Sequence, residues 1–374
     1  MGLTFRLRST PRQSVVTHSA STRHALHPAW GIAVFLLIAL IGLFAVKWSP
    51  YYDRAFVAAQ THSIGQSILA GPGGELPPPS FQAALGYAMS YGAAIWKALL
   101  LGLLLGSAMQ ALLPADWIRR WLGGSGTGSI LAGTLLSIPS MMCTCCSAPV
   151  VNGLRDCRAA PGSTAAYWLG NTMLNPATLV FMGFVLGWHW VGLRLVVGLV
   201  MVVGLGWLLN HTGRTDGTLP AMSDEPPCSS ATVRPALDPV RALRRWARAF
   251  TGMALRLLPE YLVLVLLLGA ARAWLFPVMD GGMDNSALWI AAAAVAGLLF
   301  VIPTAGEVPI VQGLLSLGVA AGPAAALLVT LPPVSLPSLF MVARSFRSRE
   351  LAILVAGVLA MGLLAGILAI GLGF

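Results

Sequence analysis

Residues 139–154 read Pro-Ser-Met-Met-Cys-Thr-Cys-Cys-Ser-Ala-Pro-Val-Val-Asn-Gly-Leu and interrupt an otherwise apolar part of the chain. The segment brings together three cysteines, two prolines and an Asn-Gly pair. Irregular backbone at membrane depth persists only where protein packs around it or where it lines a watery cavity. Polar groups at that depth mark functional sites. We therefore expect a binding or translocation site here.

The composition indicates a membrane protein. Of 374 residues, 57% are hydrophobic and 10% are charged, and the mean hydropathy is +0.78. Several apolar runs approach the roughly 20 residues that cross a bilayer as a helix. The net charge of +10 comes from arginines in short segments between these runs, which points to the lipid bilayer and against a nucleic-acid partner. The chain has five cysteines, and three of them lie within residues 143–146. An odd number with this clustering excludes the disulfide framework of a secreted protein.

The N-terminal region is expected to be a cytoplasmic tail followed by a helix. Residues 1–28 carry four arginines and no acidic residue, and an apolar run from Trp30 to Val46 follows. The run lacks a small-x-small cleavage site, so we predict an uncleaved helix over 29–48. The Gly- and Pro-rich residues 50–80 fit an external loop.

The remaining apolar segments predict helices of two lengths. Residues 127–142 form a segment of about 24 Å as a helix, which is short of the roughly 30 Å hydrocarbon core and indicates a half-span. Full helices are predicted at about 85–113, 163–187, 191–209, 250–275, 286–302, 323–342 and 351–372. Residues 211–249 contain prolines and several arginines, which is typical of a linker that ends in a basic interfacial helix.

An internal repeat organises these segments. When the second half of the sequence is laid on the first, Pro149-Val-Val-Asn-Gly-Leu154 matches Pro309-Ile-Val-Gln-Gly-Leu314. A shared Pro-x-Val-x-Gly-Leu core with aligned amides is more specific than a chance match between apolar segments. We interpret it as a duplication.

The charge distribution predicts that the two copies are inverted. If residues 127–158 and 286–321 each enter and leave on one side, seventeen arginines lie inside and only Arg54, Arg194 and Arg272 lie outside. The predicted fold is an all-α polytopic membrane protein with two inverted repeats, each of three spanning helices plus one re-entrant helical hairpin, and an extra N-terminal helix. Its parts are a cytoplasmic basic tail (1–28), the extra transmembrane helix (29–48), membrane repeat 1 (86–210), a cytoplasmic linker (211–249) and membrane repeat 2 (250–374). Such repeats meet at a midplane substrate site in known transporters.

The cysteines are the first candidate site residues. Cys143, Cys145 and Cys146 offer soft ligands for a thiophilic atom such as Cu(I), Zn(II) or trivalent arsenic, bound as substrate. The alternative is that they are small apolar residues packed at a hairpin tip. Pro149 and Asn152 belong to the same predicted substrate site.

Polar residues also interrupt the helix that follows each hairpin. Asn171, Asn175 and Pro176 do so in the first repeat, and Thr330 and Ser335 lie in the matching region of the second. Such amides and hydroxyls either bind a polar group of the substrate or satisfy carbonyls that the prolines leave free. Both interpretations stay open.

Charged residues inside apolar segments are the candidates for proton coupling. Glu307 aligns with Ser147 at the tip of the second hairpin, where it either carries a proton or caps backbone amides. Lys97 aligns with Glu260 when Pro114 is placed on Pro277, and Arg256 lies one turn from Glu260. Structural pairing and a proton relay are the two alternatives for these residues.

The motifs resemble those of a known family. Cys143-Thr-Cys145-Cys146-Ser-Ala-Pro149, Asn152-Gly-Leu154, Asn175-Pro176 and Gly306-Glu307-x-Pro309 are similar to the signatures of the ArsP/YraQ-type predicted permeases. The resemblance covers roughly residues 86–374. It implies an inner-membrane permease, and trivalent organoarsenicals as substrates in one branch. The signature cysteines map onto Cys143 and Cys145, whereas Cys146 stands where that family usually has glycine.

Three functions are considered. The first is a secondary transporter, not an enzyme, that exports a thiophilic small molecule by proton coupling and needs no cofactor. The second is a membrane thiol-disulfide oxidoreductase that uses Cys143-Thr-Cys145-Cys146, and the third is a channel for another small solute. The chain lacks the G-x-x-x-x-G-K-[ST] motif, so an ATPase would have to be a separate subunit. The expected location is the inner membrane with a cytoplasmic N-terminus, and no oligomeric state is predicted.

Overall fold

The computed structural model describes residues 29–65, 80–214, 239–275 and 283–374. Within these ranges every regular element is a helix, which confirms the predicted all-α polytopic fold. Five helices in the described ranges are long and apolar enough to cross a membrane: Trp30–Thr61, Phe81–Leu112, Trp188–Thr212, Ala242–Ala270 and Ser348–Gly371. The predicted tail over 1–28 and the part of the linker over 215–238 lie outside the described residues.

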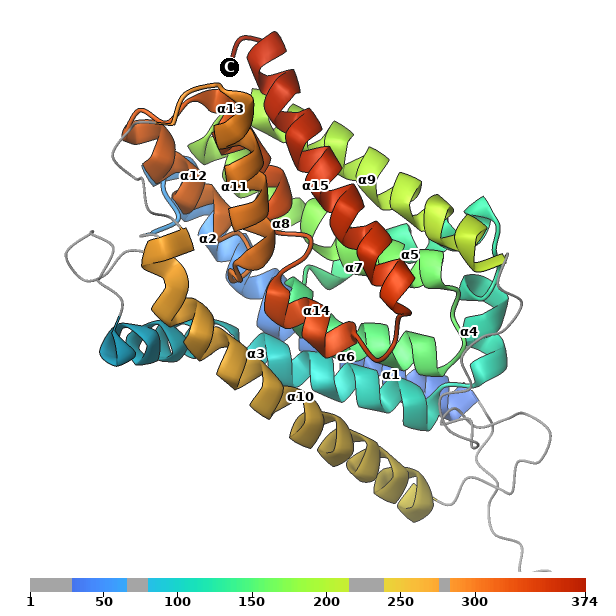
Figure 1. Ribbon diagram of the computed structural model, residues 1–374. Coiled ribbons are helices and arrows are strands. Elements are labelled where there is room, and N and C mark those ends of the chain that lie inside the picture. Colours follow the sequence, from blue (N-terminus) through green and yellow to red (C-terminus); the bar gives the residue numbers. More distant parts are fainter. Residues whose placement is uncertain (1–28, 66–79, 215–238, 276–282) are drawn as a thin grey trace, which may run out of the picture.

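The helices form two consecutive sets after the N-terminal one (Figure 1). The first set is α3 (Phe81–Leu112), α4 (Ala115–Leu122), α5 (Thr127–Ser140), α6 (Thr144–Asp156), α7 (Pro161–Met173), α8 (Pro176–Val185) and α9 (Trp188–Arg214). The second set is α10 (Pro239–Leu275), α11 (Ala287–Leu299), α12 (Glu307–Ser316), α13 (Ala321–Thr330), α14 (Leu336–Val342) and α15 (Ser348–Gly371).

The two sets share their spacing. Helices α5, α7, α8 and α9 begin at positions 127, 161, 176 and 188, and α11, α13, α14 and α15 begin at positions 287, 321, 336 and 348. The interval is the same in all four pairs, and it equals the one that separates Pro149 from Pro309. The packing order is also shared, because α7 lies between α5 and α9 as α13 lies between α11 and α15. The inverted orientation of the two sets stays a prediction.

The sets contact each other along two pairs of long helices. Helix α3 packs along α10, and α9 packs along α15 (Figure 1). The short helices α6 and α14, one from each set, also contact each other, and α6 packs on α3.

The half-span prediction for residues 127–142 agrees with the helix lengths. Helices α5 and α6 have 14 and 13 residues, respectively. Helix α5 ends because Met141 adopts a left-handed backbone with φ of 47°, which stops the helical hydrogen bonding. The corresponding tip between α11 and α12 contains Ala305 with φ of 67°. A non-glycine residue in this region is strained, and such strain concentrates at functional sites.

The predicted interruption after each hairpin is confirmed. Helix α7 ends at Met173, and α8 begins at Pro176 with Asn175 as its N-cap. The Asn175 side chain accepts hydrogen bonds from the backbone N–H groups of Ala177 and Thr178. An asparagine cap followed by proline at the first helical position favours a new helix start at this point.

The N-terminal helix is longer than predicted. The expected external loop from Pro50 is instead helical as far as Thr61, as α1 (Ala29–Leu43), the π-helical η1 (Phe44–Trp48) and α2 (Ser49–Thr61) follow without a break. Pro50 lies in the first turn of α2, directly after the wider π turn. A proline there is tolerated because the π turn already departs from regular i to i−4 bonding. This extension brings α2 against α8.

Candidate functional site

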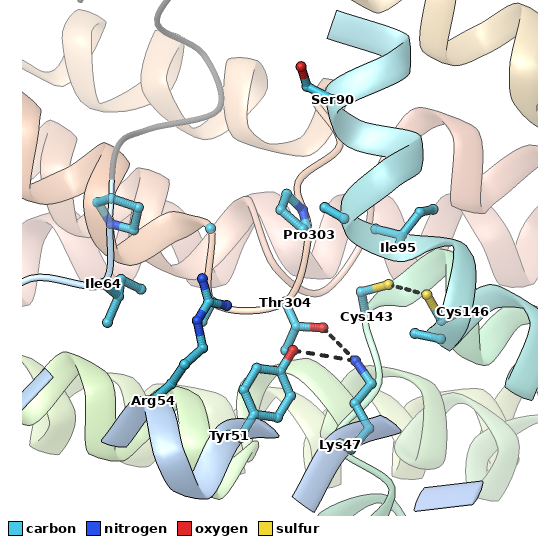
Figure 2. Close-up of a pocket in the computed structure, with 15 residues that line it drawn as sticks. Lys47, Tyr51, Arg54, Ile64, Ser90, Ile95, Cys143, Cys146, Pro303 and Thr304 are labelled. Atoms are coloured by element: carbon cyan, nitrogen blue, oxygen red, sulfur yellow. Dashed lines mark hydrogen bonds between the residues drawn. The ribbon is translucent and has the colours of Figure 1, made fainter. Parts of the chain in front are cut away.

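A cavity of about 370 Å³ lies where the two hairpin tips approach each other. The first tip contributes Cys143 and Cys146, and the second contributes the segment from Pro303 to Gly306. The remaining walls come from α3 and from the N-terminal helix (Figure 2). The cavity therefore joins three parts of the chain that are far apart in sequence.

Two of the three cysteines line this cavity. Cys143 is the N-cap of α6 and Cys146 lies in its first turn. Their sulfur atoms are 2.6 Å apart, both side chains are buried, and Figure 2 shows them pointing toward each other. Two neighbouring thiols at the start of a helix offer a pair of soft donors.

Cys145 has a different environment. Its sulfur lies 3.1 Å from the hydroxyl of Tyr91 on α3 and accepts a hydrogen bond of 3.3 Å from the hydroxyl of Tyr261 on α10. The sulfur atoms of Cys143 and Cys145 are 3.9 Å apart. Cys145 thus holds α6 between two long helices, and it is not among the residues that line the cavity.

The structure therefore divides the predicted three-cysteine cluster into a pair and a single residue. Among the described residues, no group of three or more His, Cys, Asp or Glu side chains is arranged to hold a metal ion. Of the three sulfurs, those of Cys143 and Cys146 lie side by side and line the cavity. A site with three sulfur ligands would also use the sulfur of Cys145, which contacts the hydroxyls of Tyr91 and Tyr261.

A lysine from the N-terminal helix lies beside the cysteine pair. Lys47 is 3% exposed and lines the same cavity. Its ammonium group donates to the hydroxyl of Thr304 at 3.1 Å and to the hydroxyl of Tyr51 at 3.4 Å, as Figure 2 shows. The bond to Thr304 ties the N-terminal helix to the tip of the second hairpin.

A second, very small cavity adjoins the first at Cys143. Its volume is about 10 Å³, which is about one water position. It is lined by Cys143, Asn175 and Glu307, together with the second tip. The side-chain nitrogen of Asn175 is buried and has no hydrogen-bond partner among the described residues. A buried donor without an acceptor costs free energy. This indicates that the nitrogen donates a hydrogen bond to a ligand or a water molecule.

Glu307 forms a buried ion pair. Its carboxylate lies 2.7 Å from the guanidinium of Arg194 on α9, and the two side chains are 2% and 0% exposed. The guanidinium also donates to the carbonyl of Thr172 at 2.7 Å, at the end of α7. The pair thus connects α9, the broken helix of the first set and the start of α12. The role of Glu307 in proton coupling stays a prediction.

The other predicted substrate residues lie outside both cavities. Asn171 supports the first tip, because its side-chain oxygen accepts hydrogen bonds from the hydroxyl of Ser140 and from the backbone N–H of Met142. The hydroxyl of Thr330 donates to the carbonyl of Ala326 in its own helix, and Ser335 caps α14. Pro149 is buried within α6.

Asn152 joins the two sets of helices at the far end of α6. Its side chain donates to the carbonyl of Met341 at 3.0 Å and accepts from the hydroxyl of Ser345 at 2.7 Å. Arg155 extends this contact, because it donates to the carbonyl of Ser345 at 2.9 Å and lies 3.8 Å from Glu350. We call this group the α6–α14 latch; it consists of Asn152, Arg155, Met341, Ser345 and Glu350.

Asp156 lies at the end of α6 beside the latch, and its protonation should make the free energy of unfolding depend on pH. Burial raises the pKa of Asp156 from 3.8 to about 6, against the opposing effects of Arg155, Arg256 and Gln110. Because the folded state holds this proton more tightly than the unfolded state, the free energy of unfolding falls as the pH rises from about 4 to 6 and is level above that. The loss is on the order of 2–3 kcal/mol.

We expect the Asp156→Asn variant to lack this loss, since the amide keeps a hydrogen bond to Gln110 and does not ionise. Unfolding of both purified proteins in detergent, measured at several pH values between 4 and 7.5, checks the prediction. An unchanged pH dependence in the variant would assign the effect to other groups.

The residues predicted for a proton relay are separated. Glu260 pairs with Arg344 at 2.8 Å, not with Arg256 or Lys97, and the pair is partly exposed. The Lys97 ammonium lies 5.7 Å from the ring centre of Trp96 on an exposed face of α3. The structure therefore does not bring Lys97, Glu260 and Glu307 together.

The sequence interpretation missed the cationic side of the site. Lys47, Tyr51 and Arg54 occupy one face of the N-terminal helix and line the cavity. Arg194 is fully buried, which the sequence interpretation did not predict. A signal was present in both cases, because a single cation within an apolar run marks a polar partner inside the protein.

The geometry defines a class of protein. Short helices whose tips line a cavity, packed among long apolar helices, are typical of a membrane permease. A family model described as a predicted permease matches residues 30–169 and 94–370. The chain belongs to the ArsP/YraQ/UPF0718 permease family.

Two relatives are similar over most of their length. The UPF0718 protein YraQ of Escherichia coli (strain K12) is 48% identical over 343 residues, which cover 91% of this chain and 95% of the relative. The UPF0718 protein MJ0584 of Methanocaldococcus jannaschii is 21% identical over 311 residues, 66% of this chain and 84% of the relative. No solved structure matches the chain.

Proposed function

We propose that this permease moves a small thiophilic compound through the cavity between the hairpin tips. The observation that carries the proposal is the pair of buried sulfurs of Cys143 and Cys146, 2.6 Å apart, at the wall of a cavity of about 370 Å³. Two thiols at one point suit a soft atom, such as trivalent arsenic in an organoarsenical or Cu(I). The proposed direction is export across the inner membrane, with the N-terminus in the cytoplasm.

Alternating access fits the distribution of contacts. The α6–α14 latch joins the two sets of helices at one end of α6, whereas the other end of α6 faces the cavity. If the two sets are inverted repeats, as the arginine distribution predicts, the latch lies on the cytoplasmic side. Opening of the latch then exposes the cysteine pair to the cytoplasm, and Glu307 is the proposed site of proton exchange.

Uptake into everted membrane vesicles tests this function. With methylarsenite, arsenite, copper and silver as the panel, we expect at least one to accumulate, and collapse of the proton gradient to slow it at least tenfold. Cys143→Ser and Cys146→Ser should each abolish accumulation at equal expression. Cys145→Ser should retain most of it, because a serine hydroxyl can still bond to Tyr91 and Tyr261.

The outcomes separate the hypotheses. Equal loss in all three serine variants would favour a site with three sulfurs, and activity in Cys143→Ser would refute the cysteine pair as the binding site. Equal accumulation with and without the proton gradient would refute proton coupling but would not contradict the proposed substrate class.

Thiol-disulfide exchange is the second candidate function. It is favoured by the position of Cys143 at the N-cap of α6 with Cys146 three residues on, because this spacing brings the two sulfurs together and allows them to form a disulfide. In this reaction the pair would reduce a partner disulfide and become a disulfide itself. A mixed disulfide trapped by Cys146→Ser, together with no accumulation of any member of the panel, would support it over transport.

A further inference from the structure

The buried charge of Lys47 is not balanced by any of the described residues. The ammonium is 3% exposed, and its hydrogen-bond partners, Tyr51 and Thr304, are neutral hydroxyls. Among the described residues it has no carboxylate partner. Burying a cation without a counter-charge costs free energy. An ionisable residue of this kind in a membrane protein indicates a functional site, and a cation suits the binding of a negatively charged group.

The cavity wall carries a second cation besides Lys47. Arg54 lies further along the same helix and lines the same cavity. None of the described residues that line this cavity is acidic. Glu307 lines only the smaller cavity, and Arg194 already balances its charge.

Two helices direct their N-termini at the cavity. Cys143 is the N-cap of α6 and Gly306 is the N-cap of α12, and both residues line the cavity. In the described structure neither N-cap supplies a side chain that bonds to its own helix. The first N–H groups of a helix and its dipole attract negative charge, and half-helices in transporters use this property to bind anionic groups.

Asn175 provides an independent indication of a ligand. Its side chain is fully buried, its nitrogen has no partner among the described residues, and it lines the small cavity that meets the larger one at Cys143. A donor in this position suits an acceptor oxygen that enters beside the cysteine pair.

From these observations we propose that the substrate is a compact anion that carries a soft atom. The soft atom contacts the sulfurs of Cys143 and Cys146, and the negatively charged oxygens face Lys47 and the N-terminus of α12. The inference rests on the proposed function, because it names the charge class of the compound that the same cavity would move. Thiosulfate, which has a soft terminal sulfur and three oxygens, is a suitable probe, and sulfate is its hard counterpart.

Binding of radiolabelled thiosulfate to the purified full-length protein tests the proposal. We expect saturable binding that neutral methylarsenite displaces and that sulfate displaces at least tenfold less well. Lys47→Gln should weaken thiosulfate binding at least tenfold, Lys47→Arg should keep it within about threefold, and binding should weaken as the salt concentration rises. Arg120→Gln, which removes an exposed cation on α4, is the matched control and should not change binding.

The design distinguishes failure of this inference from failure of the proposed function. If vesicles accumulate methylarsenite while thiosulfate does not bind, or if Lys47→Gln binds thiosulfate as the unaltered protein does, the anionic substrate class is refuted and the permease proposal survives. If neither compound binds or moves, both fail. Methylarsenite uptake by Lys47→Gln reports whether that variant is folded, since a neutral compound does not need the charge.

Discussion

Replacing Arg194 by methionine should lower the free energy of unfolding by about 3–5 kcal/mol. The guanidinium is 0% exposed and lies 2.7 Å from the carboxylate of Glu307, which is itself 2% exposed. Removal of the cation leaves that carboxylate buried and unpaired in an apolar body. It also removes the donor to the carbonyl of Thr172, so the end of α7 loses a contact next to Asn175. Thermal and denaturant unfolding of the purified protein in detergent measure the loss.

The double variant Arg194→Met/Glu307→Gln is the control. A neutral amide costs far less to bury than a carboxylate, so we expect the second change to recover more than half of the loss. Recovery should be incomplete because the carbonyl of Thr172 still lacks its donor. A loss below about 1 kcal/mol in the single variant, or additive losses in the double one, would contradict the view that the ion pair holds α9 against α12.

The Gly102→Ala variant should lose about 3 kcal/mol and most of its transport activity. A β-carbon at Gly102 on α3 would lie 1.9 Å from the carbonyl oxygen of Cys146, and a backbone atom cannot move aside alone. Helix α6 must therefore shift away from α3. Because Cys146 belongs to the sulfur pair and Cys145 bonds to Tyr91 on α3, this shift displaces the proposed binding site.

Gly92→Ala on the same helix is the matched control. A β-carbon there meets nothing within 4 Å, so the higher helix propensity of alanine should raise stability by up to about 1 kcal/mol. Unfolding in detergent and uptake into vesicles are measured for both variants. Equal stability and uptake in Gly102→Ala and Gly92→Ala would show that the close approach of α3 and α6 is not required.

The interruptions of the helices could be predicted because they depend on residues that are adjacent in the sequence. Asn175-Pro176 combines a capping side chain with a proline that cannot continue the preceding helix, and the structure starts α8 at that proline. The half-span over residues 127–142 followed from length alone, and α5 ends at Ser140. The repeat interval, taken from two matched motifs, recurs in the starts of four pairs of helices.

At the N-terminal helix, the local sequence gave a wrong prediction of the point where the helix ends. Lys47-Trp-Ser-Pro50 has the composition of a helix end, and a loop was expected from Pro50. The helix continues because Lys47 bonds to Thr304 and Trp48 bonds to the carbonyl of Pro139, so the tips of both hairpins support the chain at this point. Neither partner can be inferred from the local sequence.

By itself, the sequence determined the class of fold, the duplication and the positions at which helices break. Hydropathy, cap residues and prolines act over a few neighbouring residues, so their effects can be predicted without knowing the packing. Only the tertiary structure decided which side chains line the candidate site: it grouped Cys143 and Cys146 with Lys47, assigned Cys145 to Tyr91 and Tyr261, and paired Arg194 with Glu307. The physical reason is that a buried charge or thiol takes its partner from whichever helix packs against it, and that contact depends on how segments far apart in the sequence are arranged in three dimensions, as Lys47 and Thr304 are.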